Sequence, residues 1–452
     1  AAYMKDVDIE LWKLGVTSKT EHNEAAPAQH EMAPIYAQCN VAVDHNQLVM
    51  ETLKKVAGRH GLQCLLHEKP FAGVNGSGKH NNWSLTTDDG INLLDPGKRP
   101  HENVQFLLIL ACILKAVDKH AGLLRASAAD VGNDHRLGAN EAPPAIISVY
   151  LGAQLEDVLT QLVNTGSATS SIKREKLDTG VRALPDFAKD ATDRNRTAPL
   201  AFTGNKFEFR MLGSSQSVSG PNIVLNTIMA EELGKFADEL EQAEDFGAAL
   251  HNLVCRAFTE HQRIIFNGNG YSQEWEDEAA ARGLSNFRST AEALPNYINQ
   301  KNIDLVTRRG IFTESEFRAR YEIHTETYCK VMRIEAQTCA DMALRQILPA
   351  VSSYAGELCE RIARKDKLCI PCKAETALAG KLSCGIDALY AACEQLKRDM
   401  ASVPASVEEA AAYYHNIIVK DMAAVRTEAD TLELITDNSY WPFPTYSDIL
   451  FY

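Results

Sequence analysis

Near residue 220 the hydrophobic pattern of the sequence changes, and this change limits the possible folds more than composition does. From Pro221 onward almost the whole sequence has apolar residues at helical spacing, over Asn222 to about Leu253 and then over roughly 314–348, 351–365, 374–401 and 405–426. Residues 1 to about 220 mix short alternating segments, glycine-rich turns and a few helices. We therefore expect an α+β region over residues 1–220, followed by a mainly helical region over 221–452.

The charge balance excludes one class of partner. The 452 residues carry 46 basic and 60 acidic side chains, a net charge of -14. A nucleic-acid-binding surface needs clustered Lys and Arg, so this balance argues against nucleic acid. The longest apolar run, Phe106 to Leu114, ends at Lys115 and is far shorter than the roughly 20 residues of a membrane helix. We expect a buried helix there, no membrane span, and no signal peptide.

The cysteines indicate a reducing compartment. Eleven of them are scattered without regular spacing, which is typical of free thiols in a cytoplasmic protein. Cys369 and Cys372 form a Cys-x-x-Cys pair, but a zinc ribbon would need a second such pair. We expect no metal at these two cysteines.

Residues 78–84 form the first of three polar segments. On a strand, His80, Asn82 and Ser84 would point to the same side. The preceding Asn75 and Gly76 form a turn that permits close approach of a ligand. The segment is either the lining of a polar pocket or an exposed edge strand, and spacing alone does not decide between them.

The second polar segment is Lys206-Phe207-Glu208-Phe209-Arg210. The alternation places Lys206, Glu208 and Arg210 on one side of a strand, and the two phenylalanines on the side that packs inward. The charged side could face solvent or line a site for phosphate, metal and carboxylate. Spacing alone favours solvent.

The third polar segment, residues 22–31, carries Glu24 and Glu31 on either side of a turn at Pro27. Magnesium prefers oxygen ligands, and manganese accepts the same oxygens together with an imidazole. Three strands could therefore supply metal ligands, namely Glu24, Glu31, His80 and Glu208. Unrelated surface carboxylates are the alternative, and it is the stronger interpretation without further information.

A family resemblance changes these interpretations. The order of the motifs is similar to that of glutamine synthetases: Asn23-Glu24, Gln29-His30-Glu31, Lys69-Pro70-Phe71, Asn75-Gly76-Ser77-Gly78-Lys79-His80, Asn195-Arg196 and Glu208-x-Arg210. Residues 67–84 and 201–210 resemble the type III branch. The resemblance implies a glutamine synthetase-like catalytic domain, with a curved antiparallel sheet flanked by helices, and a helical C-terminal region that completes and extends it. It also implies an ATP-dependent ligase that makes L-glutamine from L-glutamate and ammonia through γ-glutamyl phosphate.

The resemblance assigns roles position by position. Divalent metal, Mg²⁺ or Mn²⁺, would be held by Glu24, Glu31, His80 and Glu208. The amino acid substrate would meet Asn75, Gly76, His80, Arg136 and Arg210. ATP would meet Asn82, Ser84, Arg196, Lys206 and Tyr36, although a core tyrosine is an alternative for the last. Catalysis would depend on Arg136, Arg196, Arg210 and Glu141, the last of which would bind ammonium and take its proton.

Two departures from the family pattern matter. Ala201 occupies a position where most branches have an arginine. The family's Glu-x-Glu metal strand lies well upstream of Glu24, yet only 23 residues precede Glu24 and none of them forms such a strand. The small N-terminal β-domain is also absent. We therefore expect low activity from these 452 residues alone.

Two other functions remain open at this stage. A γ-glutamyl-polyamine ligase would keep the phosphoryl chemistry and change the amine, and a non-catalytic relative would only bind glutamate or nucleotide. The resemblance further implies glutamate, ammonium and ATP as ligands and a ring-shaped homo-oligomer, a dodecamer. The aromatic tail, Tyr440 to Tyr446, is expected to dock on its own chain or on a neighbouring subunit.

Overall fold

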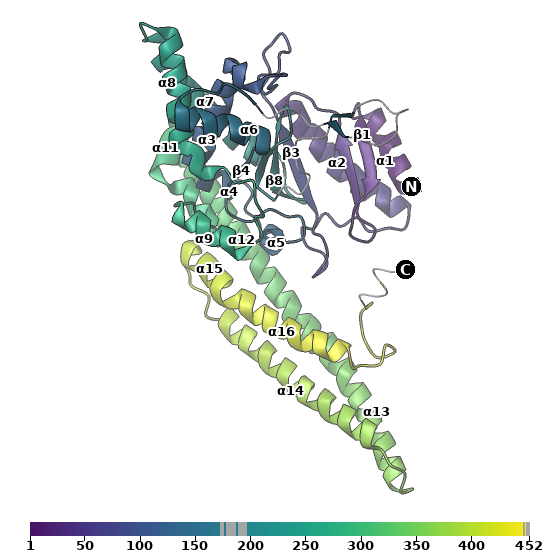
Figure 1. The fold of residues 1–452 in the computed structure, drawn as a ribbon. Coiled ribbons are helices and arrows are strands. Elements are labelled where there is room, and N and C mark those ends of the chain that lie inside the picture. The colour runs from purple at the N-terminus through teal and green to yellow at the C-terminus, as the bar shows by residue number, and fades with distance from the viewer. Residues whose placement is uncertain (172–175, 178–186, 189–196, 446–447, 449–452) are drawn as a thin grey trace. The chain divides into compact units, whose positions relative to one another are not determined.

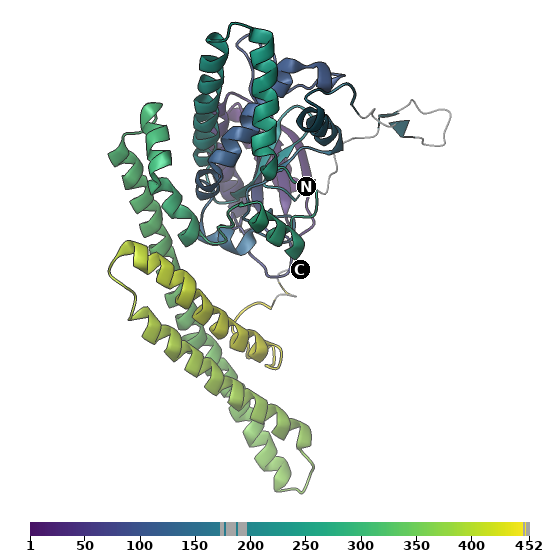
Figure 2. The same ribbon diagram turned by 60° about the vertical axis from the view of Figure 1, so that its left-hand side comes forward.

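The computed structural model describes residues 1–171, 176–177, 187–188, 197–445 and 448 (Figure 1, Figure 2). The chain forms two compact units, Ala1–Ala319 and Arg320–Tyr452. These units divide at 319/320 because the first helices after residue 220 pack into the first unit, whereas the change to a mainly helical chain lies near residue 220. After residue 213 the described residues form helices and no strands, as the periodicity predicts.

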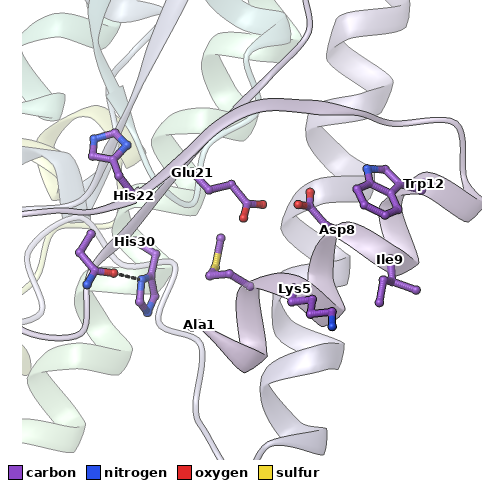
Figure 3. A pocket seen from close by; sticks show the side chains of 10 residues that line it. Ala1, Lys5, Asp8, Ile9, Trp12, Glu21, His22 and His30 are labelled. Carbon is purple, nitrogen blue, oxygen red and sulfur yellow. Dashed lines mark hydrogen bonds between the residues drawn. The ribbon is translucent and has the colours of Figure 1, made fainter.

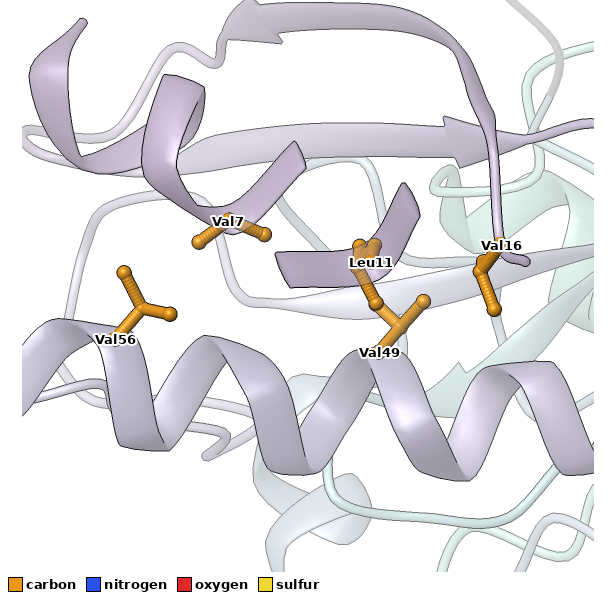
Figure 4. Close-up of a cluster of buried hydrophobic side chains, with 5 residues drawn as sticks. All are labelled: Val7, Leu11, Val16, Val49 and Val56. Atoms are coloured by element: carbon orange, nitrogen blue, oxygen red, sulfur yellow. The ribbon is translucent and has the colours of Figure 1, made fainter. Parts of the chain in front are cut away.

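The first unit opens with a helix, a hairpin and a second helix. These are α1 (Ala2–Lys13), β1 (Ser18–Asn23), β2 (His30–Pro34) and α2 (Cys39–Arg59). A core between α1 and α2 consists of Val7, Leu11, Val16, Val49 and Val56 (Figure 4). Met32 of β2 packs against the same core. The hairpin is therefore fixed to both helices by apolar burial.

The central sheet has the strand order β3-β8-β7-β4. Its strands are β3 (Gly78–Trp83), β8 (Phe207–Gly213), β7 (Leu200–Phe202) and β4 (Val149–Tyr150). The β3–β8 and β8–β7 pairs are antiparallel, whereas β4 and β7 run parallel. The sheet is thus mixed at one edge and not wholly antiparallel as expected. A separate two-stranded pair consists of β5 (Lys176–Leu177) and β6 (Phe187–Ala188).

Three helices, α3 (Val104–Lys119), α7 (Ser219–Glu241) and α8 (Phe246–His261), pack against one another beside the sheet (Figure 1). The apolar run of α3 is buried on nearly every side, including Phe106, Leu110, Ile113 and Leu114. This burial explains its composition without a lipid environment. None of the described helices is both long and apolar enough to span a bilayer.

Shorter helices complete the first unit: α4 (Ala121–Ala126), α5 (Val131–Arg136), α6 (Ala153–Thr165), α9 (Gln273–Ala281), α10 (Thr290–Ala293) and α11 (Gln300–Arg308). Helix α5 is fixed at both ends of its first turn. The side chain of Asp130 caps it by accepting the Gly132 N–H, and Asp134 accepts the N–H of Thr290 at 2.7 Å. Asn133 of α5 donates to Met211 O at 2.7 Å, which holds the helix, and with it Arg136, against β8.

The second unit is an antiparallel helical assembly. Helix α12 (Glu314–Met342) begins before the boundary and continues through a π-helical turn (Ala343–Ile347) into α13 (Leu348–Asp366). The chain returns through α14 (Lys373–Met400), α15 (Val407–Tyr413), a second π-helical turn (Tyr414–Ile418) and α16 (Val419–Glu433). The ring of Tyr440 packs on Tyr354 at 5.3 Å, and its hydroxyl donates to Glu357. The described part of the aromatic tail thus docks on its own chain.

Candidate metal and substrate site

The β1–β2 hairpin brings two carboxylates and an imidazole together. His22 lies opposite Glu31 in the register, and Glu24 follows directly after β1. Nε2 of His22 is 3.1 Å from a carboxylate oxygen of Glu24 and 3.6 Å from one of Glu31. Within the described residues this is the one group of three or more acidic, His or Cys side chains whose ligand atoms all lie within 4.8 Å of one another.

The two carboxylates repel each other in the absence of a cation. A hydrogen bond with Glu24, together with partial burial, raises the pKa of Glu31 to about 7. The charge of Glu208 raises the pKa of Glu31 further, so Glu208 lies within electrostatic range of the hairpin. A divalent cation would relieve this repulsion, and two carboxylate oxygens with one imidazole nitrogen suit Mg²⁺ or Mn²⁺. The residues present therefore fit a divalent metal.

The structure groups the expected ligands differently from the sequence interpretation. Glu24 and Glu31 do meet, but their imidazole partner is His22, which the sequence interpretation missed. His80 and Glu208 lie outside the cluster of closest groups. His80 is exposed on the same face of β3 as Asn82 and Ser84, although the β3–β8 register shifts between Lys79 and Asn81. Strand pairing across the hairpin was the signal that could have identified His22.

A cavity of about 460 Å³ lies between the hairpin and α1 (Figure 3). Asp8 of α1 and Glu21 of β1 approach each other across it, and burial together with Asp8 raises the pKa of Glu21. The hydroxyl of Ser18 donates to Asp8 at 2.8 Å. His22 lines this cavity as well, so the cavity and the carboxylate cluster share one side chain.

Strand β3 has the two faces that the alternation predicts. Asn81 and Trp83 are buried, whereas His80, Asn82 and Ser84 are exposed. Asn81 donates to Asn222 at 3.0 Å and Trp83 donates to Asn226 at 2.9 Å, which ties β3 to α7. These two bonds hold the exposed polar face in a fixed orientation.

Strand β8 buries more of its charged face than the alternation suggested. Phe207 and Phe209 are fully buried, and Arg210 is only 8% exposed, because β8 lies between β3 and β7. Glu208 is half-buried opposite Asn82, and Lys206 precedes the strand. The solvent interpretation is therefore wrong for Arg210.

Ala201 faces the interior. It is fully buried and packs with Tyr150 and Ala198. The small side chain at this position is therefore part of the core, and the contacts of Ala201 are apolar.

Arg136 is buried beneath the glycine turn. Its guanidinium donates to Met211 O at 3.3 Å, to Leu212 O at 3.2 Å and to Arg210 O at 3.2 Å. Burial lowers its pKa to about 10. Arg136 therefore stabilises β8. Only 5% of the residue is exposed, whereas an arginine that binds a substrate directly would be expected to be more accessible.

Glu68 supplies a buried negative charge next to this arginine. It is 2% exposed and accepts the Ser215 N–H at 2.9 Å, while its backbone oxygen accepts the Ser77 N–H at 2.8 Å. Its charge favours the protonated forms of Arg136 and Lys79, although burial lowers the pKa of Lys79 to about 8. The sequence interpretation gave Glu68 no role, since a single carboxylate in a loop carries no spacing signal.

Asn75 and Gly76 are partly buried, and the backbone oxygen of Gly76 accepts a 2.9 Å hydrogen bond from Gln29. This bond connects the expected substrate turn to the hairpin that carries Glu24 and Glu31. The hairpin that carries the carboxylate cluster is therefore bonded directly to the turn.

Glu141 is exposed and adopts a left-handed backbone conformation, with φ 70°. Its backbone oxygen accepts a 3.4 Å hydrogen bond from Arg210. Tyr36 is 95% exposed, so the alternative of a core tyrosine is wrong. Arg196 lies outside the described residues.

The comparisons with known proteins agree on one family. Residues 1–139 match the family described as glutamine synthetase, catalytic domain, and residues 249–366 match the glutamine synthetase C-terminal domain. A glutamine synthetase of Butyrivibrio fibrisolvens is 44% identical over 100% of this chain and 65% of its own length. The type-3 glutamine synthetase of Dictyostelium discoideum is 43% identical over 99% of this chain and 62% of its own length.

A glutamine synthetase of Bacteroides fragilis is 41% identical over 100% of this chain and 64% of its own length. The chain therefore belongs to the glutamine synthetase family. It spans slightly less than two thirds of the length of these relatives.

Proposed function

We propose that the chain contributes the catalytic site of an ATP-dependent ligase that makes L-glutamine from L-glutamate and ammonia. The observation that carries the proposal is the contact between Glu24 and Glu31, beside His22, on a hairpin bonded to the glycine turn. Two carboxylates that repel each other next to a substrate turn are suited to a divalent cation. The family membership supports the same reaction.

Glu24, Glu31 and His22 would hold one metal ion, with Glu208 near enough to contribute to its charge environment. When bound, Mg²⁺ or Mn²⁺ supplies positive charge that offsets the phosphates of ATP. His80, Asn82 and Ser84 present polar groups from the exposed face of β3. We assign His80 to the metal and substrate side, and Asn82, Ser84, Lys206 and Tyr36 to the nucleotide.

The reaction would proceed in two steps. The side-chain carboxylate of glutamate attacks the terminal phosphoryl group of ATP, so that γ-glutamyl phosphate forms and ADP leaves. Ammonia then attacks the acyl carbon and phosphate leaves. Arg210 and Arg196 would offset negative charge when the two anions meet. Glu141 would bind ammonium and take the proton that makes ammonia nucleophilic.

Arg136 has a different part in this proposal from the one that the resemblance implied. With its guanidinium on three carbonyls of β8, it would fix the strand that carries Arg210. Asn75 and Gly76 would then meet the amino acid substrate from the turn above it. Arg136 is thus proposed as a positioning residue.

The second candidate, a γ-glutamyl-polyamine ligase, shares these steps and differs in the amine. The exposed carboxylate of Glu141 favours a small cation such as ammonium. We also propose that the complete enzyme is a ring-shaped homo-oligomer, a dodecamer, working in the cytoplasm, where the eleven free thiols would stay reduced.

The test combines binding with turnover. L-Glutamate is titrated calorimetrically into the chain with MgCl₂ and a non-hydrolysable ATP analogue, and phosphate release is then measured with ATP and either ammonium or putrescine. The proposal predicts glutamate binding that requires both metal and nucleotide, and slow phosphate release that depends on ammonium. Faster release with putrescine would favour the polyamine ligase. Nucleotide binding without any phosphate release would favour a non-catalytic relative.

A further inference from the structure

The loop of the β1–β2 hairpin is closed by its own hydrogen bonds. The Glu24 N–H donates to Gln29 O at 2.9 Å, and the Gln29 N–H donates to Ala26 O at 3.2 Å. At the base of the loop, Nδ1 of His30 lies 2.8 Å from Oδ1 of Asn23, its partner in the strand register. The position of Gln29 is therefore fixed relative to Glu24, a proposed metal ligand.

The side chain of Gln29 reaches from this loop to the glycine turn. Its Nε2 donates to Gly76 O at 2.9 Å, across 47 positions of the chain. Gln29 is partly buried, and its amide carries no charge, so the bond does not depend on the titration of either partner. Two hydrogen bonds therefore connect the backbone of Glu24 to the turn, one through the carbonyl of Gln29 and one through its side chain.

The other side of the turn is held by groups that do not belong to the hairpin. The Ser77 N–H donates to Glu68 O at 2.8 Å. A Cβ atom at Gly76 would lie 2.5 Å from that same oxygen and 3.1 Å from Cγ of Arg136. The turn therefore has no room to move toward Arg136, and on the hairpin side its Gly76 carbonyl is held by Gln29.

We propose that Gln29 is a positioning residue, which couples divalent-metal binding on the hairpin to binding of the amino acid substrate at the glycine turn. This inference rests on the function proposed above. Without a cation, the adjacent carboxylates of Glu24 and Glu31 repel each other, which favours opening of the loop between them. A cation offsets this repulsion, so the loop and the Gln29 amide lose conformational freedom before glutamate binds. Ordering of the turn then costs less, and glutamate binds more tightly.

A purely structural role for Gln29 leads to a different expectation. If the bond only fastened the hairpin to the turn, its loss would weaken glutamate binding equally with and without metal. If Gln29 couples the two ligands, its loss weakens glutamate binding chiefly when metal is present. The metal dependence of the effect therefore distinguishes the two roles.

The first test requires neither glutamate nor catalysis. Residue-resolved hydrogen–deuterium exchange is measured with and without MgCl₂ in the wild type, in Gln29→Met and in Gln161→Met. Gln161 is the matched control, because its partly buried amide also donates to a backbone oxygen, that of Ser170 at 3.1 Å. We expect MgCl₂ to slow exchange at the Glu24 amide in all three proteins, and at the Ser77 amide in the wild type and Q161M only. Equal slowing at Ser77 in Q29M would overturn the proposal.

The second test measures affinity. L-Glutamate is titrated calorimetrically with a non-hydrolysable ATP analogue present, either with saturating MgCl₂ or with a chelator. With MgCl₂, Q29M should bind glutamate roughly 3- to 10-fold more weakly than the wild type, as expected for the loss of one hydrogen bond. With the chelator, Q29M and the wild type should differ by less than about twofold. Q161M should match the wild type in both conditions, and an equal loss in Q29M with and without metal would overturn the coupling role.

The outcomes separate this inference from the proposed function. If MgCl₂ does not slow exchange at Glu24 in the wild type, the metal site fails and the inference fails with it. If the wild type binds metal and glutamate and Q29M retains the full effect of metal, only the inference fails. Should Q29M unfold, Gln29→Asn replaces it, since this amide is one methylene shorter and does not reach Gly76 O. Q29N should show the same metal-dependent loss, and wild-type behaviour of Q29N would contradict the proposal.

Discussion

Gly78 packs directly on the guanidinium of Arg136. A Cβ atom at Gly78 would lie 2.2 Å from Nη2 and 2.3 Å from Cζ of that arginine. Gly76 approaches the same side chain, since its Cβ would lie 3.1 Å from Cγ. The glycine turn therefore packs closely on Arg136, which in turn donates to carbonyls of β8, so that these three parts together support the proposed substrate site.

Gly78→Ala should disrupt this support. The added methyl group must displace the guanidinium, and overpacking of this kind costs about 1–3 kcal/mol of the free energy of unfolding. Glutamate affinity should fall roughly tenfold or more, because Arg136 fixes β8. Gly58→Ala in α2 is the matched control, since no atom lies within 4 Å of its Cβ, and it should leave stability unchanged or raise it by up to about 1 kcal/mol. Equal denaturation midpoints for G78A and wild type would contradict the packing argument.

Divalent metal should bind more tightly as the pH rises. The pKa of Glu31 is raised to about 7, so below that pH a proton competes with the metal. Mn²⁺ affinity, measured by calorimetry, should increase by about tenfold between pH 6 and pH 8. Glu31→Gln should bind Mn²⁺ more weakly and should lose most of this dependence on pH. A pH-independent wild-type affinity would refute the assignment.

The same carboxyl group affects stability without metal. A folded-state pKa above the unfolded value of 4.5 means that the folded chain binds the extra proton. Its contribution to stability is fully present below about pH 4.5 and is lost as the pH rises through about 7. Comparison of the pH dependence of thermal unfolding in the wild type and in E31Q, with a chelator present, should show this loss in the wild type only. Parallel curves would contradict it.

Glu68→Gln should destabilise the first unit. The substitution leaves the buried cations of Arg136 and Lys79 without the nearby carboxylate, at a cost of at least about 2 kcal/mol. The control is Glu102→Gln, because Glu102 pairs with Arg99 at 2.7 Å on an exposed surface. That variant should change the unfolding free energy by less than about 1 kcal/mol in denaturant titrations. A loss no larger in E68Q than in E102Q would show that the carboxylate is not needed there.

The sequence predicted those features that depend on local periodicity. The mainly helical part of the chain begins with α7 at residue 219, close to the change of pattern at Pro221. Strands β3 and β8 place Trp83 and Phe207 inward, as the alternation requires. Motif order identified Glu24 and Glu31, which do meet. These predictions use only neighbours along the chain, where the rules of helix and strand geometry apply directly.

The features that the sequence did not predict depend on contacts between distant segments. His22 joins the cluster because the hairpin register sets it opposite Glu31. Arg136 is buried against β8 because a glycine turn about 60 residues earlier in the chain packs on its side chain. The unit boundary at 319/320 reflects packing among helices and leaves no mark in composition.

The proposed function depends on a divalent cation held by Glu24, Glu31 and His22 beside the glycine turn. Anomalous diffraction from crystals of the chain grown with Mn²⁺ and an ATP analogue tests it most directly. We expect an anomalous peak within about 2.0–2.3 Å of carboxylate oxygens from both Glu24 and Glu31, and its loss in Glu24→Gln crystals. A strong manganese peak elsewhere, with the two carboxylates uncoordinated, would contradict it.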